Sequence, residues 1–450
     1  MLSTFDNEEL CRVGPGTLMG NFFRQYWIPA VRTDELPSGD CPPVRIRLLG
    51  EDLISYRTTS GAAGVIQNAC PHRGASLFFG RNEEEGLRCV YHGWKFDVTG
   101  ACVDMPSEPA ESNFRTKVHA RAYPTRERGG IIWAYMGPRE RDNLPPLPDF
   151  EANILNDDPE RIAILLRPNN WLQGIEGEMD TVHAAILHWG ADQPGEKGSF
   201  SYYHFTNRFD ARFTARETEY GAAYGCYRAA EDDTTYWRIG HMLFPFIAMQ
   251  ANGELGPEVR FNAYVPVDDY NTLQWEVQVR TDGRPARGGM RNFPINRTNE
   301  PVAMGALRTY MPQGTGWLDR FVIQQSMEND YLIDREAQKN WQSYTGIPGV
   351  RQQDMAMTES MGAIMDRPNE HLGTSDSMII KARRRWLAVA RALRDEGIIP
   401  PGVDQPELYR QRSGEIILPR SADWWEGTRE VREQWQSGEK LAAEVAGGGS

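Results

Sequence analysis

The chain has 450 residues, of which 40% are hydrophobic and 25% charged, so it is long enough to form two domains with packed cores. Its net charge of −13 argues against nucleic acid or an anionic membrane as a partner. The N-terminus, MLSTFDNEEL, lacks the basic and apolar regions of a signal peptide, and no apolar run is long enough to span a membrane. We therefore expect a soluble cytoplasmic protein, in which six cysteines do not form a disulfide scaffold.

Residues 43–137 are predicted to form a small antiparallel β domain. Val44, Ile46 and Leu48 alternate with polar residues, as in a half-buried strand. A β-hairpin is predicted from the run DLISYR, a Gly-containing turn and the run VIQNAC. The run KFDVTGACVD at 95–104 repeats this pattern. The run IIWAYMG at 131–137 adds another strand.

Two short loops in this domain each contain one cysteine and one histidine. Cys70 and His72 form a C-x-H unit, and after sixteen intervening residues Cys89 and His92 form a C-x2-H unit. Buried residues without a metal are one alternative, and a structural zinc is another, but zinc sites usually pair like residues within each unit. In a Rieske [2Fe–2S] cluster two histidines replace two cysteines on one iron. Mixed units can send each Cys to one iron and each His to the other, so this spacing favours a Rieske cluster.

The sequences around these loops, CPHRGASLF and CVYHGWKFD, closely resemble the Rieske signature. Rieske proteins of respiratory complexes carry an additional disulfide that braces the two loops. Here Cys102 is the only spare cysteine nearby, and neither loop offers it a partner. This departure favours the oxygenase branch of Rieske proteins.

The proline-rich run DNLPPLPDF at 142–150 is the best candidate for a linker, because prolines do not fit a helix interior or a central strand. We divide the chain into a Rieske domain at 1–143, with its core at about 27–137, a second domain at 144–445, and a flexible tail at 446–450.

The second domain combines helical and strand-like runs. Its composition predicts a helix at 169–189, a long loop at 283–320, and helices at 321–342 and about 376–396, the last one ended by Gly397. Between them, the region 200–280 contains the strand-like runs YYHFTNRF, TTYWRIGHMLFPFIAMQ and TLQWEVQVR. Segregated strands and helices indicate an α+β fold: an N-terminal antiparallel β domain followed by an antiparallel sheet flanked by helices.

The helical run at 169–189 contains a second set of possible metal ligands. Asp180 and His183 are three residues apart and would share one face of a helix. His183 and His188 would lie about 140° apart around the axis, so the helix must loosen or end near Trp189 and Gly190 to aim both at one ion. On spacing alone, His183 and His188 could instead be buried histidines that make hydrogen bonds and bind no metal. With a Rieske motif upstream, the two histidines and a carboxylate match the ligand set of non-haem Fe(II) oxygenases.

Together these motifs resemble the α subunits of Rieske non-haem iron aromatic ring-hydroxylating oxygenases, especially the phthalate 4,5-dioxygenase type. The resemblance extends from GPGTLMGNFFRQYWIPA at 14–30 to about residue 385. It implies a helix-grip-like catalytic domain, a [2Fe–2S] cluster, a mononuclear Fe(II) and O2 as co-substrate. It also implies that NADH electrons arrive through a separate reductase, and that the subunits form a homotrimer or stacked trimers.

The family pattern D-x-x-H-x4-H falls on Asp180, His183 and His188. By this resemblance the two histidines bind the mononuclear iron, and Asp180 is the bridge for electrons arriving from a Rieske histidine of a neighbouring subunit, with His92 preferred. The run VRQQDMAM resembles the motif that supplies the third ligand, which falls on Asp354. We considered other downstream carboxylates and expect them to cap helices, pair with basic residues or face solvent: Asp330, Asp334, Asp366 and Asp376.

The resemblance suggests an aromatic carboxylate, such as a phthalate-like compound, as substrate. Arginines could bind its carboxylate, and among Arg212, Arg216, Arg228 and Arg238 we favour Arg212 and Arg238, although each could instead be a surface charge or a structural ion pair. Demethylation of methoxylated aromatic acids on the same scaffold remains an alternative. A Rieske electron carrier without catalysis is another alternative, although His183 and His188 argue against it. A binding module that is held together by zinc is the third alternative.

Overall fold

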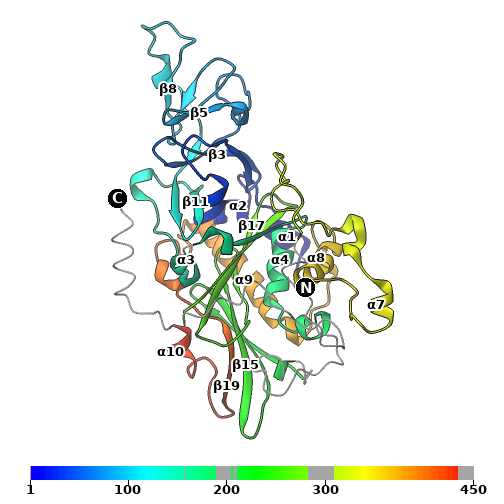
Figure 1. The fold of residues 1–450 in the computed structure, drawn as a ribbon. Helices are drawn as coiled ribbons and strands as arrows, with labels where there is room; N and C mark the ends of the chain where they lie inside the picture. Colours follow the sequence, from blue (N-terminus) through cyan, green and yellow to red (C-terminus); the bar gives the residue numbers. More distant parts are fainter. Residues whose placement is uncertain (1, 157, 189–203, 206–209, 282–308, 434–450) are drawn as a thin grey trace.

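The computed structural model describes residues 2–156, 158–188, 204–205, 210–281 and 309–433. Within these ranges the chain forms three small antiparallel sheets and one large antiparallel sheet flanked by helices (Figure 1). The predicted α+β class, with a β-rich N-terminal part followed by a sheet and helices, is confirmed. None of the helices in the described part of the chain is both long and apolar enough to cross a membrane.

The N-terminal part contains the three small sheets. The first has the order β1 (Trp27–Arg32), β11 (Ile131–Tyr135), β10 (Thr125–Arg128). The second has the order β2 (Val44–Leu48), β3 (Glu51–Arg57), β4 (Ala63–Gln67), β9 (Ala122–Tyr123). The third has the order β5 (Arg81–Glu83), β6 (Gly86–Arg88), β7 (Lys95–Phe96), β8 (Cys102–Asp104). The hairpins predicted at 52–67 and 95–104 are therefore present.

The tip of this part has a small hydrophobic core of its own. Buried apolar side chains from β3, β4, β6 and β7 pack beneath Cys70 and Cys89. Strands β1 and β11 instead contribute to the large core of the second half of the chain, as do parts of β2, β3 and β4. The two Cys/His loops are thus carried on a separately packed tip, and the base of the same domain is part of the main body.

The large sheet has the strand order β12 (Ala163–Arg167), β18 (Thr272–Arg280), β17 (Glu258–Pro266), β16 (Ile247–Met249), β15 (Thr234–Leu243), β14 (Gly221–Ala229), β13 (Arg212–Thr218). One strand missed by the sequence analysis, β19 (Gly414–Pro419), pairs with β15 from far downstream. The run YYHFTNRF was predicted as a strand, but its described residues, His204 and Phe205, are helical. Its other residues and most of the predicted loop at 283–320 lie outside the described ranges.

The described α-helices are α1 (Thr4–Cys11), α2 (Leu18–Phe23), α3 (Glu151–Leu155), α4 (Trp171–Met179), α5 (His183–Leu187), α7 (Arg335–Lys339), α8 (Val350–Ser360), α9 (Ser377–Glu396) and α10 (Arg429–Arg432). The helix predicted at 376–396 corresponds to α9 and ends at Gly397, whose φ of 70° is readily adopted by glycine. The helix predicted at 321–342 is wrong in extent. A 3-10 segment at Met327–Leu332 with three left-handed residues breaks the region, and only α7 is α-helical.

Helix α9 packs one apolar stripe against β13, β14 and α2. Its buried residues recur every three or four positions and include Met378, Ala382 and Trp386, which places them along one face. Trp386 contacts Trp171 of α4 edge-to-face, with the ring centroids 5.0 Å apart. The N-terminal helices α1 and α2 also pack against α9. The start of the chain is therefore fixed to the main body before the chain enters the small sheets.

A buried cluster of charges joins α4, α9 and the segment between α8 and α9. Glu176 of α4 accepts hydrogen bonds from Arg367 at 3.0 Å and from Arg383 of α9 at 2.5 Å. Arg383 also pairs with Glu370. Burial opposes ionisation of Glu176, but the two arginines outweigh it and hold the pKa of this carboxyl below its usual range. All four side chains are nearly inaccessible to solvent, so each charge depends on its partners.

We expect Glu176→Ala to destabilise the fold by about 3–5 kcal/mol, because it leaves two buried arginines without their shared carboxylate. Urea unfolding followed by tryptophan fluorescence would measure the change. Glu426→Ala removes an exposed ion pair with Arg429 and serves as the control, with an expected effect of less than about 1 kcal/mol. Equal losses for the two variants would show that burial of the cluster does not determine its contribution.

Candidate metal centres and active site

The two Cys/His loops have the same backbone hydrogen-bonding pattern. In the first, the Cys70 N–H donates to the carbonyl of Ala75, and the Gly74 N–H donates to the carbonyl of Cys70, at 2.8 and 2.9 Å. In the second, Cys89 and Gly93 make the equivalent bonds, again at 2.8 and 2.9 Å. Both glycines have φ near +80°, a conformation that side chains with a Cβ disfavour. The sequence thus builds two equivalent loops that face one another.

The side chains of these loops fit a cluster with mixed ligands. The rings of His72 and His92 lie 4.3 Å apart, and His72 stacks on Trp94. Nδ1 of His72 is buried without a hydrogen-bond partner, as expected for a nitrogen that coordinates a metal. Burial, with a contribution from the adjacent Cys89, raises the pKa of the Cys70 thiol to about 11. Thiolates would need a compensating cation in this pocket, which iron would supply.

The chain breaks its helical path at Asp180, well before Trp189 and Gly190, where the sequence analysis expected the helix to loosen or end. α4 ends at Met179, and Asp180 adopts extended φ and ψ angles. Its Oδ1 accepts hydrogen bonds from the N–H groups of Val182 and His183, at 2.9 and 3.3 Å, which starts the short helix α5. Asp180 and His183 therefore do not share a helix face, because the Asp180 carboxylate caps the next helix instead. Helix α5 ends at Leu187, so the predicted end next to His188 is present.

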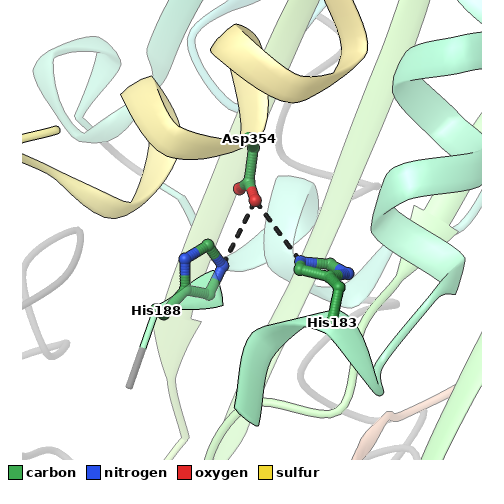
Figure 2. Close-up of side chains that lie close together, drawn as sticks. All are labelled: His183, His188 and Asp354. Atoms are coloured by element: carbon green, nitrogen blue, oxygen red, sulfur yellow. Dashed lines mark ion pairs between the residues drawn. The ribbon is translucent and has the colours of Figure 1, made fainter. Parts of the chain in front are cut away.

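His183, His188 and Asp354 come together at one point (Figure 2). Their candidate ligand atoms all lie within 4.8 Å of one another. Oδ1 of Asp354 is 3.3 Å from Nε2 of His183 and 3.2 Å from Nε2 of His188. This oxygen is buried and has no hydrogen bond to the described residues. The carboxylate comes from α8, and the two histidines come from α5 and its C-terminal cap.

Hydrogen bonds on the far side of each imidazole orient it toward Asp354. Nδ1 of His188 lies 2.7 Å from Oε1 of Gln353, and the amide nitrogen of Gln353 donates to Thr345 and to the carbonyl of Ile347. The amide oxygen of Gln353 must therefore accept a hydrogen bond from Nδ1 of His188. This leaves the lone pair on Nε2 of His188 free to bind a metal. Nδ1 of His183 similarly lies 3.5 Å from Oδ2 of Asp180. Such outer partners are typical of histidines that bind metals.

The electrostatics of the three groups also fit a cation. Burial opposes ionisation of Asp354, but His188 and His183 hold its pKa well below its usual range. Burial likewise opposes protonation of His183, yet Asp180 and Asp354 raise its pKa to about 10. The three groups therefore favour a positive charge at the position that a divalent ion would take. Two imidazoles and one carboxylate form the donor set that suits non-haem Fe(II).

A buried ion pair positions α8 so that Asp354 reaches the histidines. Arg351 of α8 donates to both carboxylate oxygens of Glu178, at 2.8 and 3.2 Å. Glu178 also accepts from Asn262 at 2.6 Å and from Tyr264, which are both on β17. Asp354 lies one turn beyond Arg351, with Nη1 3.5 Å from Oδ2. The orientation of Asp354 thus follows from contacts between α8, α4 and the sheet.

A cavity of about 360 Å³ opens beside the three groups. Its outer part is lined by apolar side chains, several of them partly exposed: Ile186, Leu187, Tyr344, Met357 and Met361. Its inner part is lined by Arg167, Gly174, Gly177 and Tyr264. Gly174 lets α4 approach Tyr264 closely, because a Cβ at this position would lie 2.6 Å from the Tyr264 ring. The cavity has the mixed character of a small-molecule site.

The arginines that we favoured for substrate binding lie elsewhere. Arg212 is exposed on the edge strand β13. Arg238 is buried on β15, where it pairs with Glu415 at 2.5 Å and donates to Thr181 at 2.7 Å. Neither residue lines the cavity of 360 Å³. Their roles in binding stay predictions.

The other candidate carboxylates lie outside the group of three. Asp334 accepts from the Ala337 N–H and caps α7, and Asp330 is exposed in the 3-10 segment. Asp376 occupies the position before α9, but its carboxylate accepts from the Gly373 N–H. The sequence analysis did not single out Gln353, Arg351 or Arg167. The adjacent Gln-Asp pair was the only available sign for Gln353, and no local pattern marks the other two.

The fold and these two sets of donors define a protein with an N-terminal iron–sulfur domain and a second metal site beside a cavity. Family models match both parts: "Rieske [2Fe-2S] domain" at residues 26–124 and "LigXa C-terminal domain like" at residues 134–445. The chain is 42% identical to the 3-chlorobenzoate-3,4-dioxygenase oxygenase subunit of Comamonas testosteroni, over 94% of this chain and 97% of that protein. It is 36% identical to the phthalate 4,5-dioxygenase oxygenase subunit of Pseudomonas putida, over 94% of each.

Solved structures share the fold at low sequence identity. Dicamba monooxygenase bound to dicamba matches with a TM-score of 0.53 and 17% identity, over 82% of this chain and 98% of that one. The NdmA QL mutant of Pseudomonas putida CBB5 with theobromine matches with a TM-score of 0.53 and 19% identity, over 86% and 96%.

The chain belongs to the oxygenase subunits of Rieske-type aromatic oxygenases, of the phthalate 4,5-dioxygenase type. It is an oxidoreductase whose cofactors are a Rieske [2Fe–2S] cluster and a mononuclear iron, with O2 as co-substrate.

Proposed function

We propose that this protein is the terminal oxygenase of a multicomponent system that inserts oxygen from O2 into an aromatic carboxylate. The observation that carries the proposal is the apolar cavity that opens onto His183 and Asp354. Related oxygenase subunits are named for 3-chlorobenzoate and phthalate, which are both aromatic carboxylates. A separate reductase and a cytoplasmic location, where NADH is available, are parts of the same proposal.

In this proposal Cys70, His72, Cys89 and His92 hold the cluster, and His183, His188 and Asp354 hold the mononuclear iron. When bound, the iron supplies the O2 chemistry that side chains cannot perform. The protein fixes the imidazoles through Gln353 and Asp180 and presents the apolar part of the cavity to the aromatic ring. Exclusion of water by that apolar surface protects the reacting position.

We expect Asp354→Ala to lose the mononuclear iron and retain the cluster, lowering iron from about three to about two atoms per chain. Iron analysis and the visible spectrum of the cluster would measure the two centres separately. Asp330→Asn is the control, because it removes a rival carboxylate while asparagine tolerates the φ of 49° at that position. Unchanged iron content in Asp354→Ala would assign the third ligand to another residue.

We further propose that Asp180 carries electrons between its neighbour His183 and His92 of another copy of the chain. The Asp180 side chain is 30% exposed, so it reaches the surface while contacting His183. The two Cys/His loops lie near β5 and β8 at one end of the molecule, well away from α4 and α8 (Figure 1). Exposed apolar side chains occur beside the two Cys/His loops, including Phe79 and Tyr91. A homotrimer or stacked trimers would cover these surfaces.

We expect Asp180→Asn to keep both metal centres and to lower turnover by about 100-fold, since it removes the negative charge that orients His183. Metal analysis together with reductase-dependent turnover would test this. Asp233→Asn, at a side chain that is 93% exposed, is the matched control and should retain full activity. Normal turnover in Asp180→Asn would refute the bridging role.

Demethylation of methoxylated aromatic acids is the second candidate function. It is favoured by 33% identity to the 5,5'-dehydrodivanillate O-demethylase oxygenase subunit of Sphingobium sp. (strain NBRC 103272 / SYK-6), over 93% of this chain and 86% of that protein. Both classes combine an aromatic ring with a carboxylate, so both are consistent with an apolar cavity that has polar groups at one end.

The reaction can be identified by incubating the protein with a reductase, NADH and either benzoate, 3-chlorobenzoate, phthalate or a methoxybenzoate. Under ¹⁸O2, dihydroxylation should place two labelled oxygen atoms in the product, whereas demethylation should release formaldehyde. Mass spectrometry distinguishes these outcomes, and we expect labelled products from at least one aromatic acid. Oxidation of NADH without an oxygenated organic product from any of them would instead support an electron carrier.

A further inference from the structure

Two methionines, one on α8 and one at its C-terminal cap, lie beside the proposed iron ligands. Met357 and Met361 both line the cavity of about 360 Å³ that reaches His183 and Asp354. Met357 follows Asp354 by three residues and Met361 follows it by seven, so the three side chains lie along one face of the helix. Side chains three residues apart on a helix have Cβ atoms about 5–6 Å from one another. The thioether of Met357 is therefore a close neighbour of the carboxylate that is proposed to hold the iron.

Both side chains are accessible as well as close to the site. Met357 is 40% exposed and Met361 is 47% exposed, whereas Met355, next to Asp354 in the sequence, is only 2% exposed and does not line the cavity. As apolar groups the two methionines resemble Leu187, which lines the same outer part of the cavity. They differ from it in reactivity, because a thioether sulfur is readily oxidised to a sulfoxide.

The oxidant for such a reaction is hydrogen peroxide, which forms when O2 takes up two electrons and two protons and no substrate receives the oxygen. Peroxide released at the iron ligands enters a cavity whose outer part contains these two thioethers. When a methionine sulfur attacks the peroxide, an S–O bond forms and the O–O bond breaks. The sulfur is oxidised by two electrons, and the other peroxide oxygen leaves as water. The product is methionine sulfoxide, and no further reactant is needed.

We propose that Met357 and Met361 are the sites at which this protein oxidises itself when it reduces O2 with no substrate in the cavity. This inference rests on the proposed function, because it requires O2 to be reduced beside His183 and Asp354. Sulfoxide groups at Met357 and Met361 would make the apolar outer part of the cavity polar and so weaken the binding of an aromatic ring. Reduction of O2 without a substrate would thus impair the cavity in which it occurs.

Two further methionines of the described chain provide an internal control. Met311 and Met327 are each 47% exposed, as is Met361, but neither lines the cavity. Peroxide in bulk solution reaches a side chain according to its exposure, so it should oxidise Met311 and Met327 about as readily as Met357 and Met361. Peroxide that forms beside Asp354 should instead favour the two methionines of the cavity.

The test uses the iron-loaded protein in the absence of any aromatic compound. The protein is reduced with dithionite without air, separated from excess reductant and exposed to O2 over several cycles, with catalase present to destroy peroxide that escapes into solution. Peptide mass spectrometry then measures the sulfoxide at each methionine. We expect at least about 5-fold more sulfoxide at Met357 and Met361 than at Met311 and Met327. After chelation of the mononuclear iron, added peroxide without catalase should oxidise all four to within about 2-fold of one another.

A pair of matched double variants checks the assignment through the mass of the intact protein. Met357→Leu with Met361→Leu should abolish most of the mass increase that the cycles produce, whereas Met311→Leu with Met327→Leu should leave it unchanged. The inference is overturned if the cycles oxidise the four methionines of the wild type equally. It is also overturned if the protein without mononuclear iron shows the same preference in these cycles, because the preference would then come from the local surroundings of the two side chains.

Turnover separates this inference from the proposed function. Iron-dependent oxidation of Met357 and Met361 in a protein that oxygenates no aromatic acid would contradict the proposed function and leave the two modification sites standing. Oxygenation of an aromatic acid by a wild type whose four exposed methionines are oxidised equally would contradict only the modification sites.

Discussion

The ion pair between Arg351 and Glu178 is the constraint on which the mononuclear site depends. It lies in a fully buried position, where breaking one partner would leave the other charge without compensation. Because Glu178 is also bound by two residues of β17, the pair fixes α8 against both α4 and the sheet. Asp354 follows one turn later on α8, so its carboxylate meets the two histidines only when this pair is formed.

Polar side chains do most of the positioning around the iron ligands, and the apolar ones shape the space beside them. Gln353 is an example. Its amide nitrogen donates hydrogen bonds to Thr345 and to the carbonyl of Ile347, and its amide oxygen accepts one from His188. The preceding glutamine and the ligand aspartate are adjacent in sequence, so one helix supplies both a ligand and the group that orients a second ligand. A small shift of α8 would therefore disturb two of the three iron ligands together.

The parts of the site that were predictable are those that depend on short stretches of chain. The proposed cluster ligands follow from spacing because each loop closes through hydrogen bonds within six residues. The two histidines follow for the same reason, although the break at Asp180 came earlier than helical periodicity suggested. His188 and Gln353 are 165 residues apart, and no local pattern specifies such a contact, so Asp354 was assigned by resemblance. Strand β19 was missed because it pairs with β15, which is similarly far away in the sequence.

The packing of α1 and α2 against α9 has a mechanical consequence for the iron–sulfur tip. The chain is anchored to the main body before β1, passes through the tip, and returns along β11, which pairs with β1. The Trp27 indole, at the start of the outgoing path, donates to the Pro145 carbonyl on the returning path. A module tied down at both ends resists rotation about a single hinge, in contrast to a domain on one flexible tether. The distance from the tip to the proposed iron site of the same chain is thus set by the architecture, which supports the proposal that electrons pass between copies of the chain.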